Sequence, residues 1–531
     1  MNMGSILASS INQINAKPNL EAQLQNQETM KIMMDNMQKK QTDLQDLGNV
    51  TDTCMMSEEA KKQMNLISGT GGNDKITSTF NKEDGSITIN INGQERTYTA
   101  EEAANGFRVE LGDGNDSVDL SAIYTSVLMD AGEGDNNITL GQGRNVVTAG
   151  DGNNIINSNG AHRNSITTGN GNNTIDVTGD INTIKTGSGT DSISVAGNDS
   201  YVDAGAGKDT ITGMGDRNRL HGGAGDDVII SSGKKDDIYG ENGNDTIVAG
   251  NGSNYIEGGK GDDKITAGNG NNVVYGLDGK DTIKVGNGKN YVDGGKDDDN
   301  ITVGTGRNIV AGGKGKDTID ATKSSSGTIL DDKDGKINAS EKMKVKTYEA
   351  NENADLGKSI KVNGDEDFQM RVESDIETYR HLESGEKLLS ELDKSGHETT
   401  IEKFDEQNGY ATAKEPYKAY VTPKGERGEG SDVTISYNPA FKGTEDYAPV
   451  GVLYHESVHA YNDATGTMQP GEQTRENNSN VNKLEQQAVG LEIKDGIPVT
   501  HPDGTVSASN PKGLTENAIR EELGFDKREV Y

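Results

Sequence analysis

The sequence predicts a multidomain protein in which a parallel β-roll, a form of β-solenoid, is followed by an α+β domain. Three observations predict this: a strict nine-residue repeat, glycine at 70 of 531 positions, and an ordinary globular composition from about residue 362 onward. With 30% hydrophobic residues and no tryptophan, the chain cannot fill one conventional core. We therefore expect an N-terminal helical segment at 1–65, a roll at 66–322, a linker at 323–361 and the second domain at 362–531.

The charge and the cysteine count exclude several classes of partner and structure. A formal charge of -34 and a pI near 4.6 argue against binding to nucleic acid and suit calcium binding or secretion. The single Cys54 excludes an internal disulfide, and we expect a monomer. The first residues lack the pattern of a Sec signal peptide, and no stretch is long enough to span a bilayer. Export therefore requires another route.

The N-terminal segment has apolar residues at helical spacing between Pro18 and Gly48. It is either an amphipathic helix docked on the next domain or a delivery segment for a secretion machine or chaperone. Further on, residues 86–91 and 95–99 alternate apolar and polar side chains around the turn pair Asn92-Gly93. This pattern predicts a β-hairpin that caps the repeats.

The repeats carry one large aliphatic residue every nine positions. Each repeat supplies a glycine-rich turn and a short strand, so two repeats complete one coil of a parallel solenoid. The aliphatic positions are 166, 175, 184, 193, 202, 211, 220, 229, 238, 247, 256, 265, 274, 283, 292, 301, 310 and 319.

A second spacing of eighteen residues distinguishes the two edges of the roll. One edge carries aspartate two positions before the aliphatic residue, at Asp191, Asp209, Asp227, Asp245, Asp263, Asp281, Asp299 and Asp317. Stacked carboxylates repel one another unless a cation lies between them, and hard oxygen ligands favour calcium. The other edge is mostly asparagine, at 218, 254, 272, 290 and 308, with Ser200 and Asp236 as exceptions. We expect calcium on the Asp edge and amide hydrogen bonds on a metal-free Asn edge.

Residues 258–266 (GGKGDDKIT) resemble the RTX (repeats-in-toxin) family at every defined position. The resemblance covers about 66–322 and implies a calcium-bound parallel β-roll. Before about residue 190 both edges carry asparagine, so we expect little calcium there. After the roll, residues 332–341 resemble an EF-hand loop, but Leu330 occupies the place of the first ligand, which favours a charged turn.

In the second domain, residues 367–392 have helical spacing, and 399–401 and 433–437 are typical of strands. We expect 432–437 to hold a substrate backbone by strand addition. The sequence HESVH at 455–459 follows an apolar run. On a helix, His455 and His459 can hold one zinc ion while Glu456 reaches a water beside it.

The third zinc ligand is expected to be a carboxylate, because positions 462 and 465, where a histidine-ligated alternative needs glycine and histidine, hold asparagine and threonine. The candidates are Asp463, Glu472, Glu476, Glu485 and Glu492. We favour Glu485, which opens a compact helical run, because a second helix presenting one carboxylate is the gluzincin arrangement. The predicted fold of 362–531 is thus an α+β gluzincin-like domain.

Three blocks at 455–461, 485–490 and 516–524, with Arg528 and Tyr531, resemble the NleD-like family of bacterial effector zinc metallopeptidases. The resemblance implies delivery by type III secretion into the host cytoplasm and cleavage of a host protein such as a stress-activated MAP kinase. Arg528 and Tyr531 also resemble the Arg-x-x-Tyr pair that stabilises the oxyanion in clostridial neurotoxin peptidases, which implies a catalytic role for both; the alternative is that they form a polar end of the C-terminal helix.

Two alternatives stay open at this point. One is a calcium-binding surface or structural protein whose C-terminal domain is an inactive peptidase. The other is an exported protease released by a type I system, although repeats in such proteins normally lie near the C-terminus and here they precede the second domain.

Overall fold

The computed structural model describes residues 58–160, 162–349, 353–404, 409–440, 449–474, 480–493 and 496–529. The chain divides into the units Met1–Met55 and Met56–Tyr531, and the following concerns the second. Of the segment expected at 1–65, only its last residues, with the short helix α3 (Glu58–Gln63), lie in this described part. The expected amphipathic stretch at 18–48 and Cys54 lie outside it.

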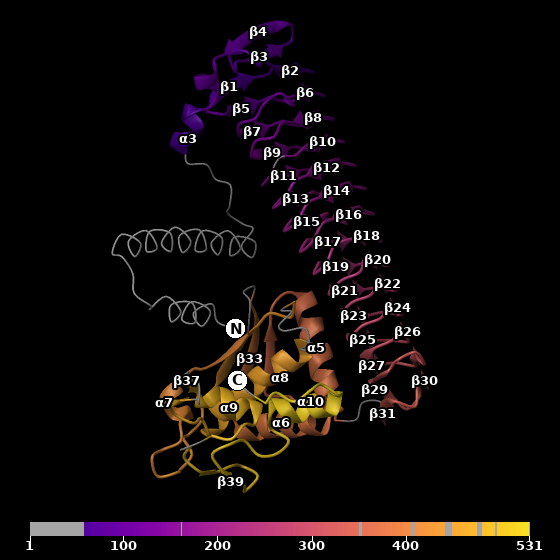
Figure 1. Ribbon diagram of the computed structural model, residues 1–531, viewed down its shortest axis with the longest axis vertical. Helices are drawn as coiled ribbons and strands as arrows, with labels where there is room; N and C mark the ends of the chain where they lie inside the picture. Colours follow the sequence, from indigo (N-terminus) through magenta and orange to yellow (C-terminus); the bar gives the residue numbers. More distant parts are fainter. Residues whose placement is uncertain are drawn as a thin grey trace, which may run out of the picture. The chain divides into compact units, whose positions relative to one another are not determined.

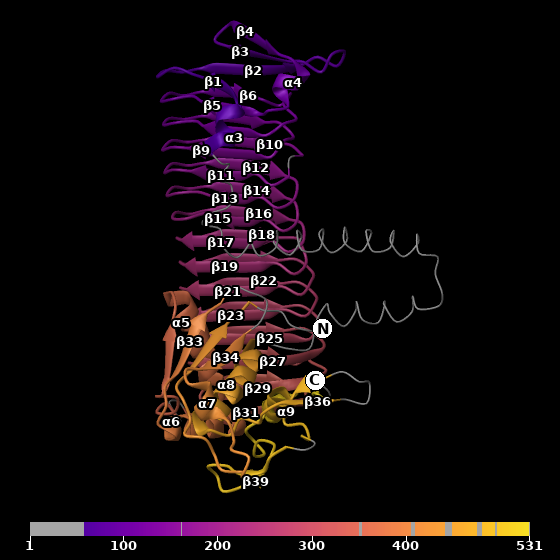
Figure 2. The ribbon, with the colours of Figure 1, turned by 90° about the vertical axis from the view of Figure 1, so that its left-hand side faces the viewer.

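Two long sheets form the roll, and their strands alternate along the chain and stack along one axis (Figures 1 and 2). Within the described ranges the first sheet has 15 strands: β1 (Asn65–Ser68), β5 (Phe107–Glu110), β7 (Val127–Asp130), β9 (Asn145–Ala149), β11 (Ser165–Thr168), β13 (Thr183–Lys185), β15 (Tyr201–Asp203), β17 (Arg219–Ala224), β19 (Asp237–Asn242), β21 (Tyr255–Lys260), β23 (Val273–Asp278), β25 (Asn290–Lys296), β27 (Arg307–Lys314), β29 (Ser326–Asp332) and β31 (Met343–Tyr348).

The second sheet has 16 strands in the same ranges: β2 (Lys75–Phe80), β3 (Ile87–Ile91), β4 (Gln94–Tyr98), β6 (Ser117–Asp119), β8 (Asn137–Leu140), β10 (Ile155–Ser158), β12 (Thr174–Thr178), β14 (Ser192–Ala196), β16 (Thr210–Met214), β18 (Val228–Ser231), β20 (Thr246–Ala249), β22 (Lys264–Ala267), β24 (Thr282–Val285), β26 (Asn300–Val303), β28 (Thr318–Ala321) and β30 (Lys336–Ala339). Apart from the β2-β3-β4 hairpins, all pairings in both sheets are parallel.

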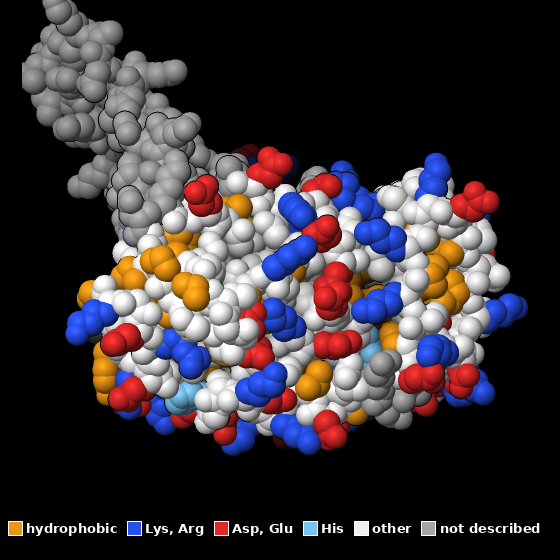
Figure 3. Space-filling model, turned by 90° about the horizontal axis from the view of Figure 1, so that it is seen from below, with side chains coloured by type: hydrophobic (Ala, Val, Ile, Leu, Met, Phe, Trp, Pro, Cys, Tyr) orange, Lys and Arg blue, Asp and Glu red, His pale blue; other side chains and the backbone are white. Residues whose placement is uncertain are grey.

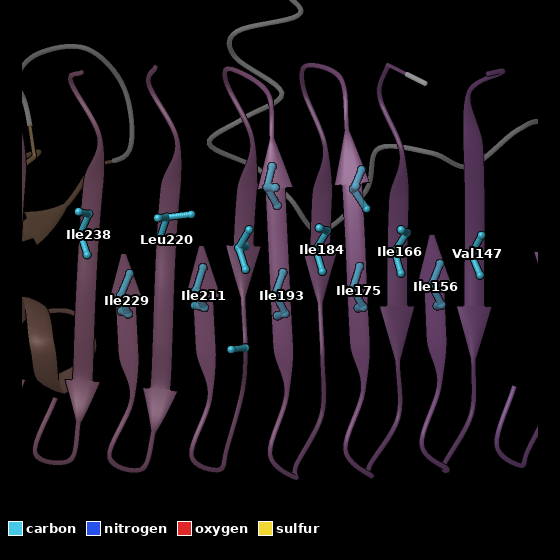
Figure 4. Close-up of a cluster of buried hydrophobic side chains, with 14 of the residues drawn as sticks. Val147, Ile156, Ile166, Ile175, Ile184, Ile193, Ile211, Leu220, Ile229 and Ile238 are labelled. Atoms are coloured by element: carbon cyan, nitrogen blue, oxygen red, sulfur yellow. The ribbon is translucent and has the colours of Figure 1, made fainter. Parts of the chain in front are cut away.

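Strand pairing confirms the register predicted from the aliphatic residues. Ile166 lies opposite Ile184 in the first sheet, and Ile175 lies opposite Ile193 in the second, so partners are eighteen residues apart. The predicted aliphatic positions from 166 to 319 are all at most 1% exposed. Figure 4 shows these side chains in two files that alternate between neighbouring strands. The core of the roll is therefore narrow and continuous.

The predicted hairpin closes the N-terminal end of the second sheet. β3 and β4 pair antiparallel around Asn92 and Gly93, whose φ angles of 50° and 88° suit a type I′ turn. Helix α4 (Ala100–Ala103) follows and begins with a capping box between Thr99 and Glu102. The sequence therefore predicted the turn and the hairpin, but not helix α4.

The expected linker at 323–361 is wrong over 326–348, where the roll continues. β29 and β31 extend the first sheet and β30 extends the second. Ile329 lies opposite Val310, and Ile337 lies opposite Ile319, so aliphatic residues preserve the register after the glycine pattern has ended. The EF-hand-like sequence is accordingly the turn from β29 into strand β30.

A four-stranded sheet with the order β32-β33-β35-β34 organises the C-terminal domain. Its elements in chain order are β32 (Ile360–Asn363), α5 (Glu366–Arg380), α6 (Glu383–Ser395), β33 (Thr399–Lys403), β34 (Tyr410–Ala413), α7 (Pro416–Ala419), β35 (Val433–Tyr437), α8 (Pro449–Thr465), β36 (Glu472–Thr474), β37 (Asn480–Asn482), α9 (Lys483–Val489), β38 (Val499–Thr500), β39 (Val506–Ser507) and α10 (Glu516–Leu523).

Two expectations for this domain need correction. The helical stretch predicted at 367–392 forms two helices, because the chain turns at His381 and brings Gly385 of α6 against the backbone of Tyr379. A Cβ at Gly385 would lie 2.2 Å from the Tyr379 carbonyl oxygen, so no larger residue fits. Strand β35 cannot accept an added substrate strand, because β33 and β34 pair with both of its edges. The sheet edge next to β35 belongs to β34.

Figure 3 shows Lys and Arg side chains interspersed with Asp and Glu over the face seen from below. The strongly negative net charge is therefore not gathered into one acidic patch on this face. None of the helices in the described ranges combines the length and the apolar character needed to cross a lipid bilayer.

Candidate metal centres

Helix α8 carries both histidines of the HESVH sequence. Pro449 begins the helix, where its fixed φ is favourable, and Val450, Leu453 and Val458 are fully buried. This burial fixes the rotation of α8 inside the domain. His455 and His459, one turn apart, face the same side, and their Nε2 atoms are 3.1 Å apart.

Helix α9 brings Glu485 to these histidines. Asn482 caps the helix by accepting a hydrogen bond from the Leu484 amide, which places Glu485 in the first turn. The Glu485 Oε2 atom lies 3.2 Å from His455 Nε2 and 3.4 Å from His459 Nε2. The three side chains favoured from the sequence therefore converge.

The spacing of the three ligand atoms fits one zinc ion. Zinc binds histidine nitrogen and carboxylate oxygen at about 2.0 to 2.2 Å, so tetrahedral ligand atoms lie about 3.3 Å from one another. The three separations here are 3.1, 3.2 and 3.4 Å. A set of three protein ligands leaves the fourth tetrahedral position open, as a catalytic zinc site requires.

The electrostatics of the cluster favour a positive charge between its members. Burial alone would lower the pKa of His455, but hydrogen bonds to Glu485 and Glu516 raise it to about 10. Burial alone would raise the pKa of Glu485, yet its hydrogen bonds to both histidines hold that pKa far below the usual range. A cation held between the imidazoles and the carboxylate would supply this positive charge.

Glu516 contacts the ligand cluster and was not among the residues predicted from the sequence. It lies in α10, is fully buried, and its Oε2 atom is 2.8 Å from His455 Nδ1. A carboxylate on the second ring nitrogen of a metal-binding histidine fixes the tautomer that presents Nε2 to the metal. Arg520 also binds Glu516, at 3.0 Å. The sequence contained no spacing signal for this contact, because 61 residues separate Glu516 from His455.

Glu456 lies beside the ligand cluster on the same helix. It is only 6% exposed, and burial raises the pKa of its carboxyl while the two histidines oppose that rise. The Ala411 backbone N–H of strand β34 donates to it. A Cβ at Gly409 would lie 3.3 Å from Glu456 Cγ, so the chain before β34 passes close to this carboxylate.

The other carboxylates considered as third ligands do not join the cluster within the described side chains. Asp463 is buried one turn after His459 on α8, and burial raises its pKa to about 7. Glu492 is exposed after α9. Glu476 and the side chain of Glu472 lie outside the described residues.

The aspartates of the Asp edge form one continuous row along the roll. The backbone N–H of Asp191 donates to Asp209 Oδ1 at 2.7 Å, and the same bond repeats at 2.7 or 2.8 Å for each following pair. All eight side chains are 1 or 2% exposed. Each carboxylate is therefore buried and fixed by the coil that precedes it.

Residues 357–531 match the model of the family Peptidase_M91, described as an effector protein. The model of the RTX calcium-binding nonapeptide repeat matches repeatedly within the roll, at 130–162, 167–202, 196–229, 203–236, 231–265, 239–274, 248–283, 266–301 and 293–322. The chain therefore joins RTX calcium-binding repeats to a C-terminal Peptidase_M91 effector domain. Searches of curated proteins and of solved structures each give no match.

The second carboxylate oxygens of the RTX roll fit calcium. From Asp191 to Asp299, the Oδ2 atoms are buried and accept no hydrogen bond from the described residues. A Cβ at Gly258 would lie 2.4 Å from Asp263 Oδ2 and 2.8 Å from the Gly276 carbonyl oxygen. Carboxylate and carbonyl oxygens thus meet where glycine leaves room, as calcium coordination requires.

Burial makes these carboxylates costly to ionise without a cation. It raises the pKa of Asp209 and Asp227 to about 7 and that of Asp263 and Asp281 to about 8. At the C-terminal end of the row, Asp331 is fully buried beside Asp317, and its pKa is raised to about 8. Asp331 precedes the EF-hand-like sequence and was not among the expected calcium ligands.

The Asn edge satisfies its own polar groups, as expected. The Asn272 side-chain amide donates to the Gly268 carbonyl at 3.0 Å and to Asn290 Oδ1 at 3.2 Å. Asn290 donates in turn to Asn308 Oδ1 at 2.9 Å, and Asn308 donates to Ser324 Oγ at 2.7 Å. Asp236 interrupts this row, and its Oδ2 accepts a hydrogen bond from the Ser231 hydroxyl.

Arg528 contacts Glu516, on the side of His455 away from the other candidate metal ligands. Its Nη1 atom is 3.1 Å from Glu516 Oε2, the same oxygen that binds His455. Asn517 holds the Arg528 backbone through two hydrogen bonds. Tyr531 lies outside the described residues, and the oxyanion role of this pair stays a prediction.

Proposed function

We propose that the M91 domain is a zinc-dependent endopeptidase with the two-histidine, one-glutamate ligand set of gluzincins. The observation that carries this proposal is the convergence of His455, His459 and Glu485 at the separations of a tetrahedral site. Family membership supports peptidase activity, and the effector description supports a protein of the host as substrate.

Five residues share the chemistry in this proposal. When bound, zinc supplies a Lewis acid that lowers the pKa of a coordinated water to about 7. Glu456 takes a proton from the attacking water on its carboxylate and returns it to the leaving nitrogen. Glu516 keeps the Nδ1 proton of His455 in place, and so holds Nε2 toward the ligand cluster. His459 and Glu485 complete the ligand set.

Strand β34 is the proposed docking edge for the substrate backbone. Within the described residues it pairs with β35 on one side only, and its Ala411 N–H points to Glu456. An extended peptide that adds to this edge would pass the general base with its backbone aligned. The substrate-binding strand is thus one position further out in the sheet than the sequence led us to expect.

Secretion is supported by the effector family and by the RTX repeats. Type III delivery into the host cytoplasm, a secretion chaperone, a monomeric state and a MAP kinase substrate are the finer parts of the proposal, and they rest on the resemblance of the C-terminal blocks to NleD-like effectors.

The decisive experiment exposes eukaryotic cell lysate to the wild-type protein and to Glu456→Gln, and maps new protein N-termini by mass spectrometry. Glu456→Gln keeps the ligand set and the shape of the side chain but removes the base. Equal zinc content in the two proteins is the control. New termini produced only by the wild type would identify the substrate and the cleavage site. No new termini would favour a calcium-binding protein with an inactive peptidase domain.

A further inference from the structure

A row of tyrosines lies on the outer face of the first sheet of the roll. Tyr255, Tyr275 and Tyr291 come from the neighbouring strands β21, β23 and β25, and their ring centroids are 6.1 and 5.4 Å apart. An outer face of a solenoid is normally in contact with water, yet these rings are at most 3% exposed. Helix α5 of the M91 domain covers them, since the rings share one apolar cluster with Phe368 and Val372.

Arg371 of α5 stabilises the contact between α5 and the tyrosine row. Its side chain is fully buried, and its guanidinium carbon lies 3.4 Å from the centroid of the Tyr275 ring. Its Nε atom donates to Tyr255 Oη at 3.0 Å, and its Nη1 atom pairs with Asp375 at 2.8 Å. Without the tyrosines, this charge would lose its cation–π contact and a hydrogen bond. The M91 domain therefore buries a charged side chain against this face of the roll.

Two routes connect the roll to the metal ligands. Through α5, the Tyr379 hydroxyl donates to the Val450 carbonyl at 2.6 Å, in the first turn of α8. Through the C-terminal segment, Arg307 of strand β27 pairs with Asp526 at 3.2 Å. The Asp526 carbonyl accepts a hydrogen bond from Arg520, and Arg520 binds Glu516, the partner of His455.

The same strands contact the calcium-binding row. In β21, Gly258 follows Tyr255 by three residues and lies against the unbonded Oδ2 of Asp263. In β23, a Cβ at Gly276 would be 2.2 Å from Asp281 Oδ2. Repulsion between ionised neighbours in this row therefore acts directly on the strands that present the tyrosines.

We propose that calcium binding to the Asp edge builds the tyrosine face on which the M91 domain is assembled, so that the metal centre of α8 forms only on a calcium-loaded roll. Calcium is thus a folding cofactor of the peptidase domain as well as of the roll. The consequence for catalysis rests on the proposed peptidase function, whereas the structural coupling does not.

The test uses full-length Glu456→Gln protein, which keeps the metal ligands. Calcium is varied by dialysis at constant free zinc, because a chelator would remove both metals. Hydrogen–deuterium exchange is followed in α5 and α8 by mass spectrometry. We expect amide exchange in both helices to become at least about tenfold faster without calcium. Unchanged exchange in α5 and α8, while the roll itself loses protection, would overturn the proposal.

A variant pair separates docking from general loss of fold. Tyr275→Ala removes a ring from the docked row, and we expect faster exchange in α5 and lower zinc content even with saturating calcium. Tyr201→Ala removes a ring from strand β15 of the same sheet, and within the described residues this ring contacts His221 and Lys185 of the roll. Tyr201→Ala should leave α5 and zinc content unchanged. Equal effects of the two substitutions would overturn the proposal.

A last measurement distinguishes failure of the coupling from failure of the proposed activity. Wild-type peptidase activity is measured on the identified substrate across the same calcium series. Activity that is the same with and without calcium would overturn the coupling. If the wild type cleaves nothing, the exchange experiment on α5 and α8 still decides whether calcium assembles the domain.

Discussion

The two edges of the roll share one backbone, and in most of the later coils they differ only in carrying aspartate or asparagine. On the Asn edge, the Asn272 amide nitrogen donates to a glycine carbonyl and to the next asparagine. On the Asp edge, one repeat earlier, Asp263 presents an oxygen that accepts no hydrogen bond from the described residues. Replacing NH2 by oxygen therefore changes a row that satisfies itself into one that requires a cation or a proton.

The N-terminal coils show that the residue, not the edge, makes this difference. Asn173 lies in the same row as Asp191, and its amide donates to the Gly171 carbonyl at 3.0 Å and to Asp191 Oδ1 at 2.9 Å. The Asp edge thus accommodates asparagine without distortion. Aspartate in the later coils therefore makes this row depend on a cation, although the same backbone forms with asparagine in the earlier coils.

The largest effect is expected from converting one edge into the other. Asp227, Asp263 and Asp299 are replaced together by asparagine. Calcium binding should fall, and the difference in thermal midpoint between calcium-loaded and calcium-free protein should shrink to roughly half, because fewer carboxylates then need a cation. Calcium content is measured by equilibrium dialysis, and unfolding is measured by circular dichroism.

The matched control replaces the preceding residues, Asp226, Asp262 and Asp298, by asparagine. The change in charge is identical, but these side chains lie at the surface and pair with lysines or with backbone amides. If both triple variants lose the same amount of calcium, the buried row is not the binding site.

The next effect is the pH dependence of the calcium-free roll. Burial raises the pKa of Asp209 and Asp227 to about 7 and of Asp263 to about 8 in the folded protein, above the unfolded value of about 4. The folded state then binds more protons, so stability is full below pH 4 and is lost as the pH rises through 7 to 8. A rise of the pKa from about 4 to about 7 corresponds to roughly 4 kcal/mol for each group.

Thermal unfolding of calcium-free protein at pH 5 and pH 8 checks this direction, and the midpoint should be higher at pH 5. Saturating calcium should remove the difference, because the ion replaces the protons. A calcium-free midpoint that is higher at pH 8 would contradict the buried, unpaired state of these carboxylates.

The smallest effect is expected on the Asn edge. Asn272→Ala removes four hydrogen bonds and leaves the Asn254 amide and the Gly268 carbonyl each short of a partner, which should cost about 1 to 3 kcal/mol in the free energy of unfolding. Because no metal is involved, the loss should be the same with and without calcium. Asn287→Ala, in an exposed asparagine row, is the control and should cost less. A loss of unfolding free energy that differs with and without calcium would indicate that an ion binds on the Asn edge too.

Much of the roll could be predicted because its register is local. One aliphatic residue such as Ile265 in each repeat, and a turn pair such as Asn92-Gly93, define coils and cap without knowledge of distant contacts. The last coil was not predicted, because its serines and its longer turn break the glycine pattern, although Ile329 and Ile337 continue the core. The tyrosine row that contacts α5 was not predicted, because the nine-residue pattern concerns only the residues that point inward. Tyr255 and Tyr275 occupy the positions next to the aliphatic residue, which point outward in a strand.

In the metal centre, His455, His459 and Glu485 could be proposed because two of them are one helical turn apart and the third begins a short helix. Glu516 and the edge strand β34 could not be found this way. Glu516 reaches His455 from another helix, and β34 becomes an edge strand only through the order of strands in the sheet. Contacts that depend on tertiary arrangement leave no spacing in the sequence.

The amides of the Asp row give the roll a direction. Each aspartate N–H is satisfied by the coil that follows it, from Asp191 through Asp299 to Asp317. Coils removed from the N-terminal side would leave every remaining amide of the row with its partner, whereas a break on the C-terminal side would orphan the coil before it. The aspartate amides of this row therefore depend on the C-terminal side of the roll, which is also the side that contacts the M91 domain.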